Sequence, residues 1–187
     1  MDKRFDEQRI AKLCSEHNRQ AEDELYIQYA ARLYTLCLRY CSNKDDARDL
    51  MQESFIKAFE SISGFTYKGE GSLYAWISRI AVNMALNELK NRRWRFISLD
   101  MLPFDVPDDP PKSLVTSIPE EVLLKMIADL PAMKRAVFNM YCIDGYSHNE
   151  IASTLGITEK GSASALAKAK AELKKQINKY KKQTETI

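Results

Sequence analysis

The chain has 187 residues, of which 45% are hydrophobic and 29% charged, and its formal net charge is +2 at neutral pH. This length suits one compact domain or two small ones, and the apolar fraction allows a buried core. No run of about 18 apolar residues is present, and the first residues lack the apolar segment of a signal peptide. We therefore expect a cytoplasmic protein that is not inserted in a membrane.

The charges are unevenly distributed. Residues 61–96 hold 6 basic and 2 acidic residues, residues 97–130 hold 2 basic and 7 acidic residues, and residues 131–187 hold 10 basic and 5 acidic residues. Two basic segments thus flank an acidic one, which favours two separate places that meet a polyanion. Charge alone leaves the alternative of two solvated surfaces equally open.

Helical periodicity dominates the N-terminal half. Apolar residues that recur every three or four positions predict helices over residues 6–43 in two pieces, over about 45–61, and over 72–95. Ser72 is positioned to cap the last of these helices. A polar, glycine-containing loop, residues 65–71, separates it from the helix before it.

The segment 97–116 holds four prolines and four aspartates. Because proline lacks a backbone donor and disfavours helix in the residue before it, we predict a linker here. No segment shows convincing strand alternation. The predicted fold is all-α, with two small helical domains, residues 1–96 and 117–187, joined by this acidic, proline-rich linker.

Helical patterns resume after the linker. Residues 117–120 form a capping box, and Pro131 opens another helix with Met140 and Tyr141 on its inward side. A second capping box covers residues 147–150. We expect four further helices: one that ends at Leu130, one from Pro131 to Gly145, a short one after Ser147, and a long one from Thr158 to about Tyr180.

Residues 147–171 have the layout of a helix-turn-helix motif. A short capped helix, a turn at Gly156 and a second helix capped by Thr158 match its tight spacing, with Ser162 and Leu166 on the buried stripe of the second helix. In this motif the start of the second helix lies in the major groove, and cations further along meet phosphates. A helical hairpin that packs on another protein is the alternative.

A second candidate DNA surface combines the loop 65–72 with the basic-aromatic cluster 90–96. Basic residues interleaved with aromatic ones suit single-stranded DNA, because bases stack on the rings while cations follow the backbone. Trp76 lies on an apolar stripe, which favours core packing over stacking. Trp94 and Phe96 are candidates for either role.

Cys14, Cys37, Cys41 and His17 are the residue types of a Cys3His zinc site, although buried thiols are the favoured reading. Neither His17 nor His148 has a nucleophile and an acid arranged around it in sequence, and no P-loop is present. We therefore expect no metal, no cofactor and no enzymatic activity.

The motifs resemble those of one family. The stretch DDARDLMQESF, followed by WISRIAVN and the basic cluster, resembles region 2 of extracytoplasmic-function (ECF) sigma factors of bacterial RNA polymerase. The stretch LPAMKRAVFNMYCIDGYSHNEIASTLGITEKGSASALAKAKAELKK resembles their region 4. The resemblance implies a sigma factor that binds core RNA polymerase and promoter DNA, with an anti-sigma factor as a further partner.

The same resemblance implies residue roles. The residues implied to bind core polymerase are Asp49, Leu50, Gln52, Glu53 and Ile56. Those implied to bind the minus-ten element are Tyr67, Lys68, Ser72, Arg79, Asn83, Lys90, Arg92 and Arg93. Those implied to bind the minus-thirty-five element are Thr158, Lys160, Ser162, Ser164, Lys168, Lys170 and Lys174.

The last helix departs from the family pattern. Where many members carry Thr-Val-Lys-Ser-Arg-Leu, this chain has Gly161-Ser-Ala-Ser-Ala-Leu166, so Ala163 and Ala165 replace long cations. Gly161 also costs the helix up to about 1 kcal/mol relative to alanine. Two alternatives remain open: a helix-turn-helix regulator that binds duplex DNA without polymerase, and a protein-only adaptor with a sigma-like fold.

Overall fold

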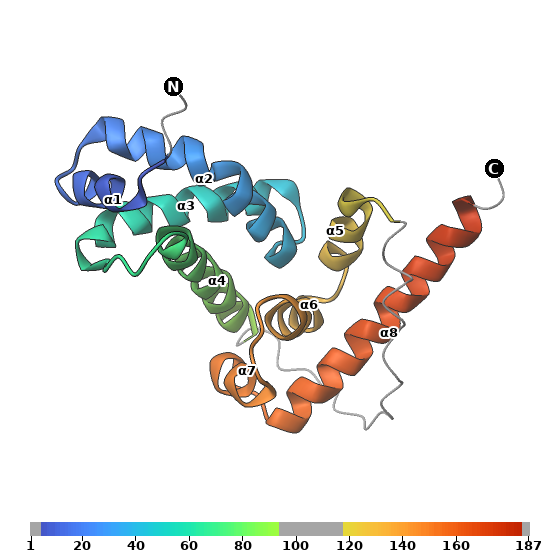
Figure 1. Ribbon diagram of the computed structural model, residues 1–187. Helices are drawn as coiled ribbons and strands as arrows, with labels where there is room; N and C mark the ends of the chain where they lie inside the picture. Colours follow the sequence, from blue (N-terminus) through green and yellow to red (C-terminus); the bar gives the residue numbers. More distant parts are fainter. Residues whose placement is uncertain (1–4, 94–117, 185–187) are drawn as a thin grey trace. The chain divides into compact units, whose positions relative to one another are not determined.

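The computed structural model describes residues 5–93 and 118–184, without the side chains of Arg92 and Arg93. All regular structure in these ranges is helical (Figure 1), as predicted. The chain divides into two compact units, Met1–Asn87 and Glu88–Ile187. Most of the predicted linker lies outside the described residues, so its boundaries remain a prediction.

The N-terminal unit begins with three helices that are capped in the same way. They are α1 (Glu7–Ser15), α2 (Arg19–Tyr40) and α3 (Lys44–Ser61). The side chains of Asp6, Asn18 and Asn43 each accept a hydrogen bond from the backbone N–H three residues later, at 2.8–3.0 Å. The predicted break within 6–43 is therefore real, and it falls between the end of α1 and the Asn18 cap.

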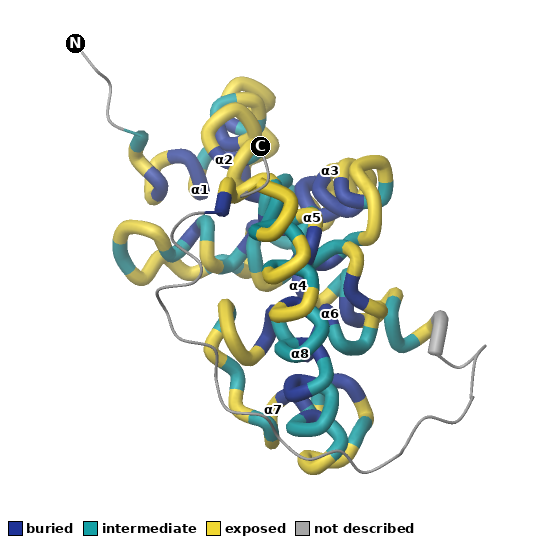
Figure 2. Tube along the Cα trace, turned by 90° about the vertical axis from the view of Figure 1, so that its right-hand side faces the viewer, coloured by how far each residue is buried: buried dark blue, intermediate teal, exposed yellow. Residues whose placement is uncertain are grey.

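A 3-10 turn, η1 (Ile62–Gly64), and most of helix α4 (Ser72–Arg93) complete this unit, whose boundary falls within α4 after Asn87. Buried and exposed stretches alternate along the helices in Figure 2, as expected for amphipathic helices around one core. The residues with no measurable exposure at its centre include Ile10, Leu25, Leu33, Leu73 and Ile77. These side chains come from α1, α2 and α4, so the core joins helices that are distant in sequence.

One buried carboxylate connects three of these helices. Glu7, on α1, is only 7% exposed. The Tyr29 hydroxyl of α2 donates to Glu7 Oε1 at 2.6 Å, and the backbone N–H of Leu73 in the first turn of α4 donates to Glu7 Oε2 at 3.2 Å. Burial and the hydrogen bond to Glu7 raise the pKa of Tyr29, so the phenol remains a donor throughout the neutral range.

Aromatic contacts reinforce the same junction. The Tyr29 ring lies 5.3 Å from Phe5 and 5.2 Å from Tyr74, centroid to centroid. The Arg32 guanidinium sits 3.7 Å above the Tyr74 ring, and the Tyr74 hydroxyl donates to the Arg32 carbonyl at 3.3 Å. The start of α4 is thus held against α2 by a hydrogen bond, ring packing and a cation–π contact.

Within residues 118–184, the C-terminal unit contains four α-helices and one π-helical turn. These elements are α5 (Glu120–Ala128), α6 (Ala132–Phe138), the π-helical turn η3 (Asn139–Ile143), α7 (His148–Leu155) and α8 (Glu159–Thr184). Helix α5 begins after Pro119, which makes no side-chain cap. Ser117 of the predicted capping box lies outside the described residues.

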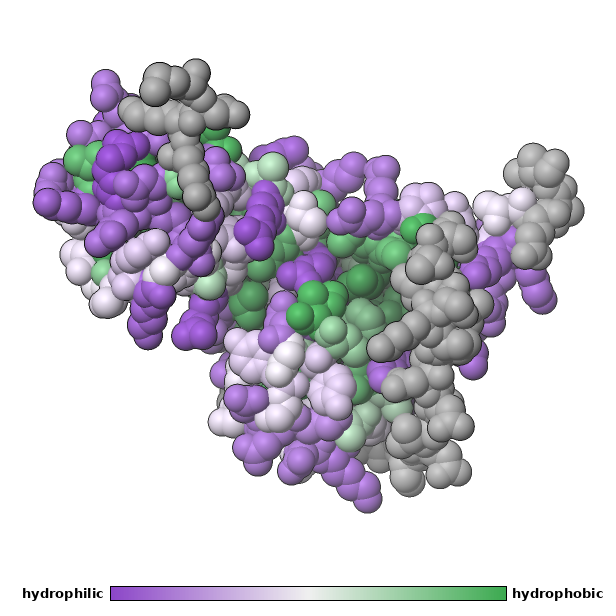
Figure 3. Space-filling model, viewed as in Figure 1, coloured by the Kyte–Doolittle hydropathy of each residue, from purple (hydrophilic) through white to green (hydrophobic). Residues whose placement is uncertain are grey.

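The core of this unit lies between α5, α6 and α8. Met126, Leu130, Ala169 and Leu173 form a buried cluster. Hydrophobic side chains also gather on the visible face over α5 and α6 in Figure 3. The buried guanidinium of Arg135 donates to the carbonyls of Ala128 and Leu130, which satisfies the C-terminal end of α5 from α6.

One inward position was predicted wrongly. Met140 is buried, but Tyr141 is 40% exposed. The reason is η3: a π-helical turn has more residues per turn than an α-helix, so the α-helical spacing used for the prediction fails there. The exposed ring instead stacks on His148, with centroids 4.4 Å apart.

We predict that Glu7→Ala lowers the free energy of unfolding of the N-terminal unit by about 2–3 kcal/mol, because Tyr29 and the Leu73 N–H lose a charged acceptor. Glu60→Ala is the control, since its ion pair with Lys57 is 59% exposed on both sides and contributes roughly 0–1 kcal/mol. Urea unfolding followed by tyrosine fluorescence measures both. Equal stability of the two variants would contradict the role of Glu7.

Candidate protein and nucleic-acid interfaces

Helix α3 presents a continuous outer surface in the middle of its length. Asp49, Gln52, Glu53 and Ile56 are all exposed, and Ile56 is 58% exposed. Their spacing of three and four residues puts them on one side of the helix. We call these four residues the acidic face.

The charges on either side of the acidic face are paired within the helix. Arg48 bonds Asp45 at 3.2 Å, and Lys57 bonds Glu60 at 3.1 Å. No ion pair within the described ranges engages Asp49 or Glu53, so both carboxylates are available to a partner with basic groups.

Leu50 requires a correction to the predicted docking set. It is 6% exposed and lies on the opposite side of α3, in the row that includes Met51 and Phe55. Its side chain contributes to the core of the unit. The acidic face therefore consists of the four exposed residues without Leu50.

The loop before α4 is ordered by its own hydrogen bonds. Ser72 was predicted to cap α4, but it is the first residue of the helix. Its hydroxyl accepts from the Lys68 N–H at 3.2 Å and donates to the Gly69 carbonyl at 2.6 Å. Gly69 and Gly71 have φ of 121° and 85°, a left-handed region that allows the chain to fold back on itself.

This loop carries exposed side chains next to a ring contact. Tyr67 is 37% exposed and Lys68 is exposed. Trp76 is partly exposed and packs on Phe65 at 5.3 Å between centroids, so one aromatic surface supports the loop from α4. The local packing favoured by the sequence is present, and stacking of Trp76 on a base stays a prediction.

Further along α4, Arg79 and Asn83 are exposed and four residues apart, which puts them on one side of the helix. Lys90 is half-buried. The backbone of Arg92 and Arg93 completes α4, and the predicted contacts of their side chains, like Trp94 and Phe96, lie outside the described structure. The structure thus brings Arg79 and Asn83 together and leaves the cluster at 92–96 as a prediction.

The helix-turn-helix geometry predicted for residues 147–171 is present. The Ser147 side chain caps α7 by accepting from the Glu150 N–H. The Glu150 carboxylate in turn accepts from the Ser147 N–H at 2.8 Å. These hydrogen bonds lower the pKa of Glu150. Gly156 is left-handed, with φ 64° and ψ 40°, and Thr158 Oγ1 accepts from the Gly161 N–H at 3.0 Å at the start of α8.

The outward side of α8 carries the cations expected of a DNA-binding helix. Lys160, Ser164 and Lys168 are four residues apart and follow one side of the helix, which we call the groove face; Lys160 is exposed, whereas Ser164 and Lys168 are half-buried. Lys174 is exposed two turns further along, and Lys170 is half-buried. In the described part of the chain no ion pair holds Lys160, Lys168 or Lys174.

Ser162 requires the second correction. Ser162 was expected on the buried stripe of the last helix and also among the DNA contacts. Its exposure of 0% agrees with the buried stripe and not with a DNA contact. Its hydroxyl lies 2.9 Å from Nδ1 of His148 on α7. A buried side chain cannot read a base edge, so Ser162 does not belong to the groove face.

The glycine at position 161 is explained by a local contact that the hydrophobic periodicity of the helix does not reveal. A Cβ at this position would lie 3.0 Å from Thr158 Oγ1, the atom that caps α8. Alanine would therefore press on the cap while improving helix propensity. The predicted cost of glycine is thus offset by an undisturbed cap.

The four cysteines are thiols and do not assemble a metal site. Cys14 and Cys37 are buried, Cys41 is half-buried and Cys142 is exposed. Across residues 5–93 and 118–184, no three His, Cys, Asp or Glu side chains are grouped to hold a metal ion. Among the same residues, no helix has the length and hydrophobicity needed to cross a membrane.

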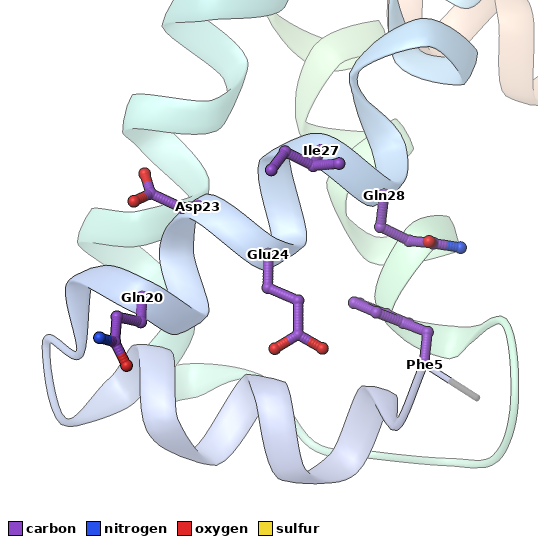
Figure 4. Close-up of a pocket in the computed structure, with 6 residues that line it drawn as sticks. All are labelled: Phe5, Gln20, Asp23, Glu24, Ile27 and Gln28. Atoms are coloured by element: carbon purple, nitrogen blue, oxygen red, sulfur yellow. The ribbon is translucent and has the colours of Figure 1, made fainter. Parts of the chain in front are cut away.

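An open depression of about 450 Å³ lies on the outer side of α2, away from the core (Figure 4). Its lining comes from the start of the described chain and from α2: Phe5, Gln20, Asp23, Glu24, Ile27 and Gln28. Glu24 is held by Arg9 through two contacts of 3.0 Å. None of the predicted contact residues lines this depression.

Two family models match the sequence: Sigma-70 region 2 over residues 25–95 and Sigma-70, region 4 over residues 120–173. The chain is similar to the ECF RNA polymerase sigma factor SigE of Mycolicibacterium smegmatis, with 32% identity over 174 residues. That alignment covers 87% of this chain and 63% of the relative, so the chain spans less than two thirds of that protein.

Two further comparisons agree. The ECF RNA polymerase sigma-E factor of Haemophilus influenzae is 29% identical over 166 residues, which are 83% of this chain and 86% of the relative. The solved structure of the sigma factor RpoE in complex with the anti-sigma factor NepR from Bartonella quintana matches with a TM-score of 0.50. It is 19% identical and covers 83% of this chain and 96% of that chain, a likeness that concerns the fold.

The burial of the cysteines predicts their reactivity. Burial raises the pKa of Cys14 to about 11 and that of Cys37 to about 12, so neither forms thiolate at neutral pH. With an aromatic disulfide reagent at about pH 8, near the ordinary thiol pKa, we expect Cys142 to react first and Cys41 next. Cys14 and Cys37 should react only after urea is added; rapid reaction of all four in the native protein would contradict the described burial.

Proposed function

The chain belongs to the ECF sigma factors of the sigma-70 family, and we propose that it binds core RNA polymerase and directs promoter recognition, DNA melting and transcription initiation. Region 2 would bind polymerase and the minus-ten element, and region 4 would bind the minus-thirty-five element. The domains proposed for these roles are residues 1–96 and 117–187, with 97–116 as the linker. The proposed activity belongs to the cytoplasm, where polymerase and chromosome meet.

The acidic face of α3 carries this proposal. It is an exposed surface of two carboxylates, one glutamine and one isoleucine on a well-packed helix, and its carboxylates have no ion pair within the described ranges. A regulator that binds only duplex DNA has no use for such a surface, because carboxylates repel phosphates. A basic partner surface on core polymerase accounts for it, with Ile56 supplying an apolar contact.

Melted minus-ten DNA is the proposed ligand of the loop 65–71 and the adjacent side of α4. Tyr67 offers a ring for stacking, Lys68 and Arg79 offer cations, and Asn83 offers an amide that can pair with a base edge. Stacking contributes on the order of 1–3 kcal/mol per base, which offsets the few kcal/mol needed to unstack a base. The DNA backbone next to the minus-ten element is the proposed contact of Lys90, Arg92 and Arg93.

Duplex DNA at the minus-thirty-five element is the proposed ligand of α8. Lys160 and Ser164 lie near its N-terminus, the part that enters the major groove in a helix-turn-helix motif, and Thr158 precedes them. Lys168, Lys170 and Lys174 follow and are proposed to contact phosphates, which set affinity more than sequence choice. Because Ala163 and Ala165 are short, methyl contacts and DNA shape contribute to readout.

Neither a metal nor a cofactor takes part in the proposed function, and the chain is proposed to have no catalytic activity of its own. An anti-sigma factor is proposed as a regulatory partner, since the solved relative from Bartonella quintana was determined with one. Of the two alternatives, the regulator leaves the acidic face unused. The protein-only adaptor leaves the cations of α8 unused.

Reconstituted transcription tests the proposal. Core polymerase with this chain should initiate at promoters selected from genomic DNA, whereas core polymerase alone should not. Tight, specific duplex binding by the chain without core would instead support the regulator. Polymerase binding without promoter-specific initiation would support the adaptor.

For the acidic face, we expect Gln52→Ala with Glu53→Ala to weaken binding to core polymerase by about 1–3 kcal/mol, the range of central interface residues. The fold should be unchanged, because both side chains are exposed. Lys57→Ala with Glu60→Ala on the same helix is the matched control. Competition for core against a labelled wild-type chain measures the affinity, and equal binding by the two double variants would reject the assignment.

For α8, we expect Lys168→Ala with Lys174→Ala to reduce the slope of log K against log salt by roughly 1.8 for holoenzyme on duplex promoter DNA, because each lost phosphate contact removes about 0.9. Lys12→Ala with Lys44→Ala, exposed and in neither proposed DNA surface, is the control. An unchanged slope in the α8 variant would show that these lysines do not meet phosphates.

A further inference from the structure

A polar contact joins the two helices of the helix-turn-helix motif at a place where apolar packing would be expected. Ser162 of α8 is fully buried on the stripe that also holds Leu166, Ala169 and Leu173. Burying a hydroxyl without a partner costs about 1–3 kcal/mol. Its partner is Nδ1 of His148, the first residue of α7, at 2.9 Å and 14 positions away in sequence.

The face of the His148 imidazole packs on an aromatic ring. The Tyr141 ring of η3 stacks on His148 with centroids 4.4 Å apart and planes inclined by 21°. His148 also follows the Ser147 capping box, which fixes the backbone at the start of α7. The order Tyr141, His148, Ser162 thus connects η3, α7 and α8 in one chain of contacts.

The buried side chains of α7 are apolar. Ile151 and Leu155 of α7 and Leu166 of α8 are buried. Apolar burial depends on area and has little directional preference. A hydrogen bond between two fixed side chains does have a preferred direction, so it selects one rotation of α8 about its axis.

That rotation matters for the groove face. Ser162 lies between Lys160 and Ser164 in the helix, on the opposite side from both. Rotating α8 about its axis at Ser162 would therefore move Lys160 and Ser164 away from base edges. The proposed phosphate contacts of Lys168 and Lys174 would be less affected by this rotation, because a flexible lysine side chain can follow a phosphate group.

From these contacts we propose that His148, supported by Tyr141, is a positioning residue that sets the orientation of the start of α8 and thereby the sequence discrimination of region 4. His148 does not itself read bases in this proposal. The inference rests on the proposed function of α8 in minus-thirty-five recognition.

The test uses holoenzyme assembled from core polymerase and the full chain. Two duplexes serve as probes: the promoter most enriched when wild-type holoenzyme selects genomic DNA, and the same duplex with a scrambled minus-thirty-five element. The ratio of their dissociation constants measures discrimination. The variants are His148→Ala, His148→Asn, Ser162→Ala and the double alanine variant, with exposed Ser153→Ala on α7 as the control.

We expect His148→Ala to reduce the discrimination ratio by about two- to tenfold, the contribution of one neutral hydrogen bond. Affinity for the scrambled duplex should not change. His148→Asn, whose side-chain amide can reach the position of Nδ1, should restore most of the ratio. In the Ser162→Ala background, His148→Ala should have no additional effect, because the shared contact is already lost.

Three results would overturn the inference: an unchanged ratio in His148→Ala, an equal loss on both duplexes, or additive effects of the two alanine substitutions. Should His148→Ala fold poorly, the comparison of Ser162→Ala with wild type and with Ser153→Ala decides in the same way. Failure of the proposed function is distinguishable, because wild-type holoenzyme would then show no promoter discrimination at all.

Discussion

The carboxylate of Glu7 is buried, and its two oxygens serve two different helices. A buried charge is tolerated only when its oxygens are hydrogen-bonded, and here the Tyr29 hydroxyl and the Leu73 N–H supply the donors. The amide belongs to the first turn of α4, where the helix dipole also favours a negative group. The position of α4 against α1 and α2 therefore depends on this carboxylate, and so does the loop 65–71, whose end is fixed where α4 begins.

This arrangement separates the two tasks proposed for the N-terminal unit. Glu7, Tyr29 and Tyr74 occupy the interior and hold α4, whereas the acidic face lies on the outer side of α3. A partner can bind the acidic face without disturbing the polar junction. The proposed DNA surface, on the loop and the outer side of α4, takes its geometry directly from that junction.

The C-terminal unit also joins its helices through buried polar contacts, here without a carboxylate. Arg135 satisfies the end of α5, and His148 satisfies the hydroxyl of Ser162 on α8. Both contacts join helices that are separated in sequence, and both are directional where the surrounding core is not. The ability of α8 to present Lys160 and Ser164 outward follows from the burial of Ser162 on its other side.

The sequence by itself determined the helices, the caps at Ser147 and Thr158, and the exposed side of α3. Ser147, Gly156 and Thr158 act through neighbours within four residues, so their roles were readable from local pattern, as were the all-α class and the outer side of α3. Tertiary structure decided the rest. The bonds Glu7–Tyr29 and His148–Ser162 join positions 22 and 14 residues apart, a separation at which periodicity carries no information. Tyr141 lies outward because a π-helical turn interrupts the α-helical spacing that the prediction assumed. The burial of Ser162 agrees with its place on the predicted stripe, and the burial of Leu50 and Ser162 removes both from the contact roles that the family resemblance implied.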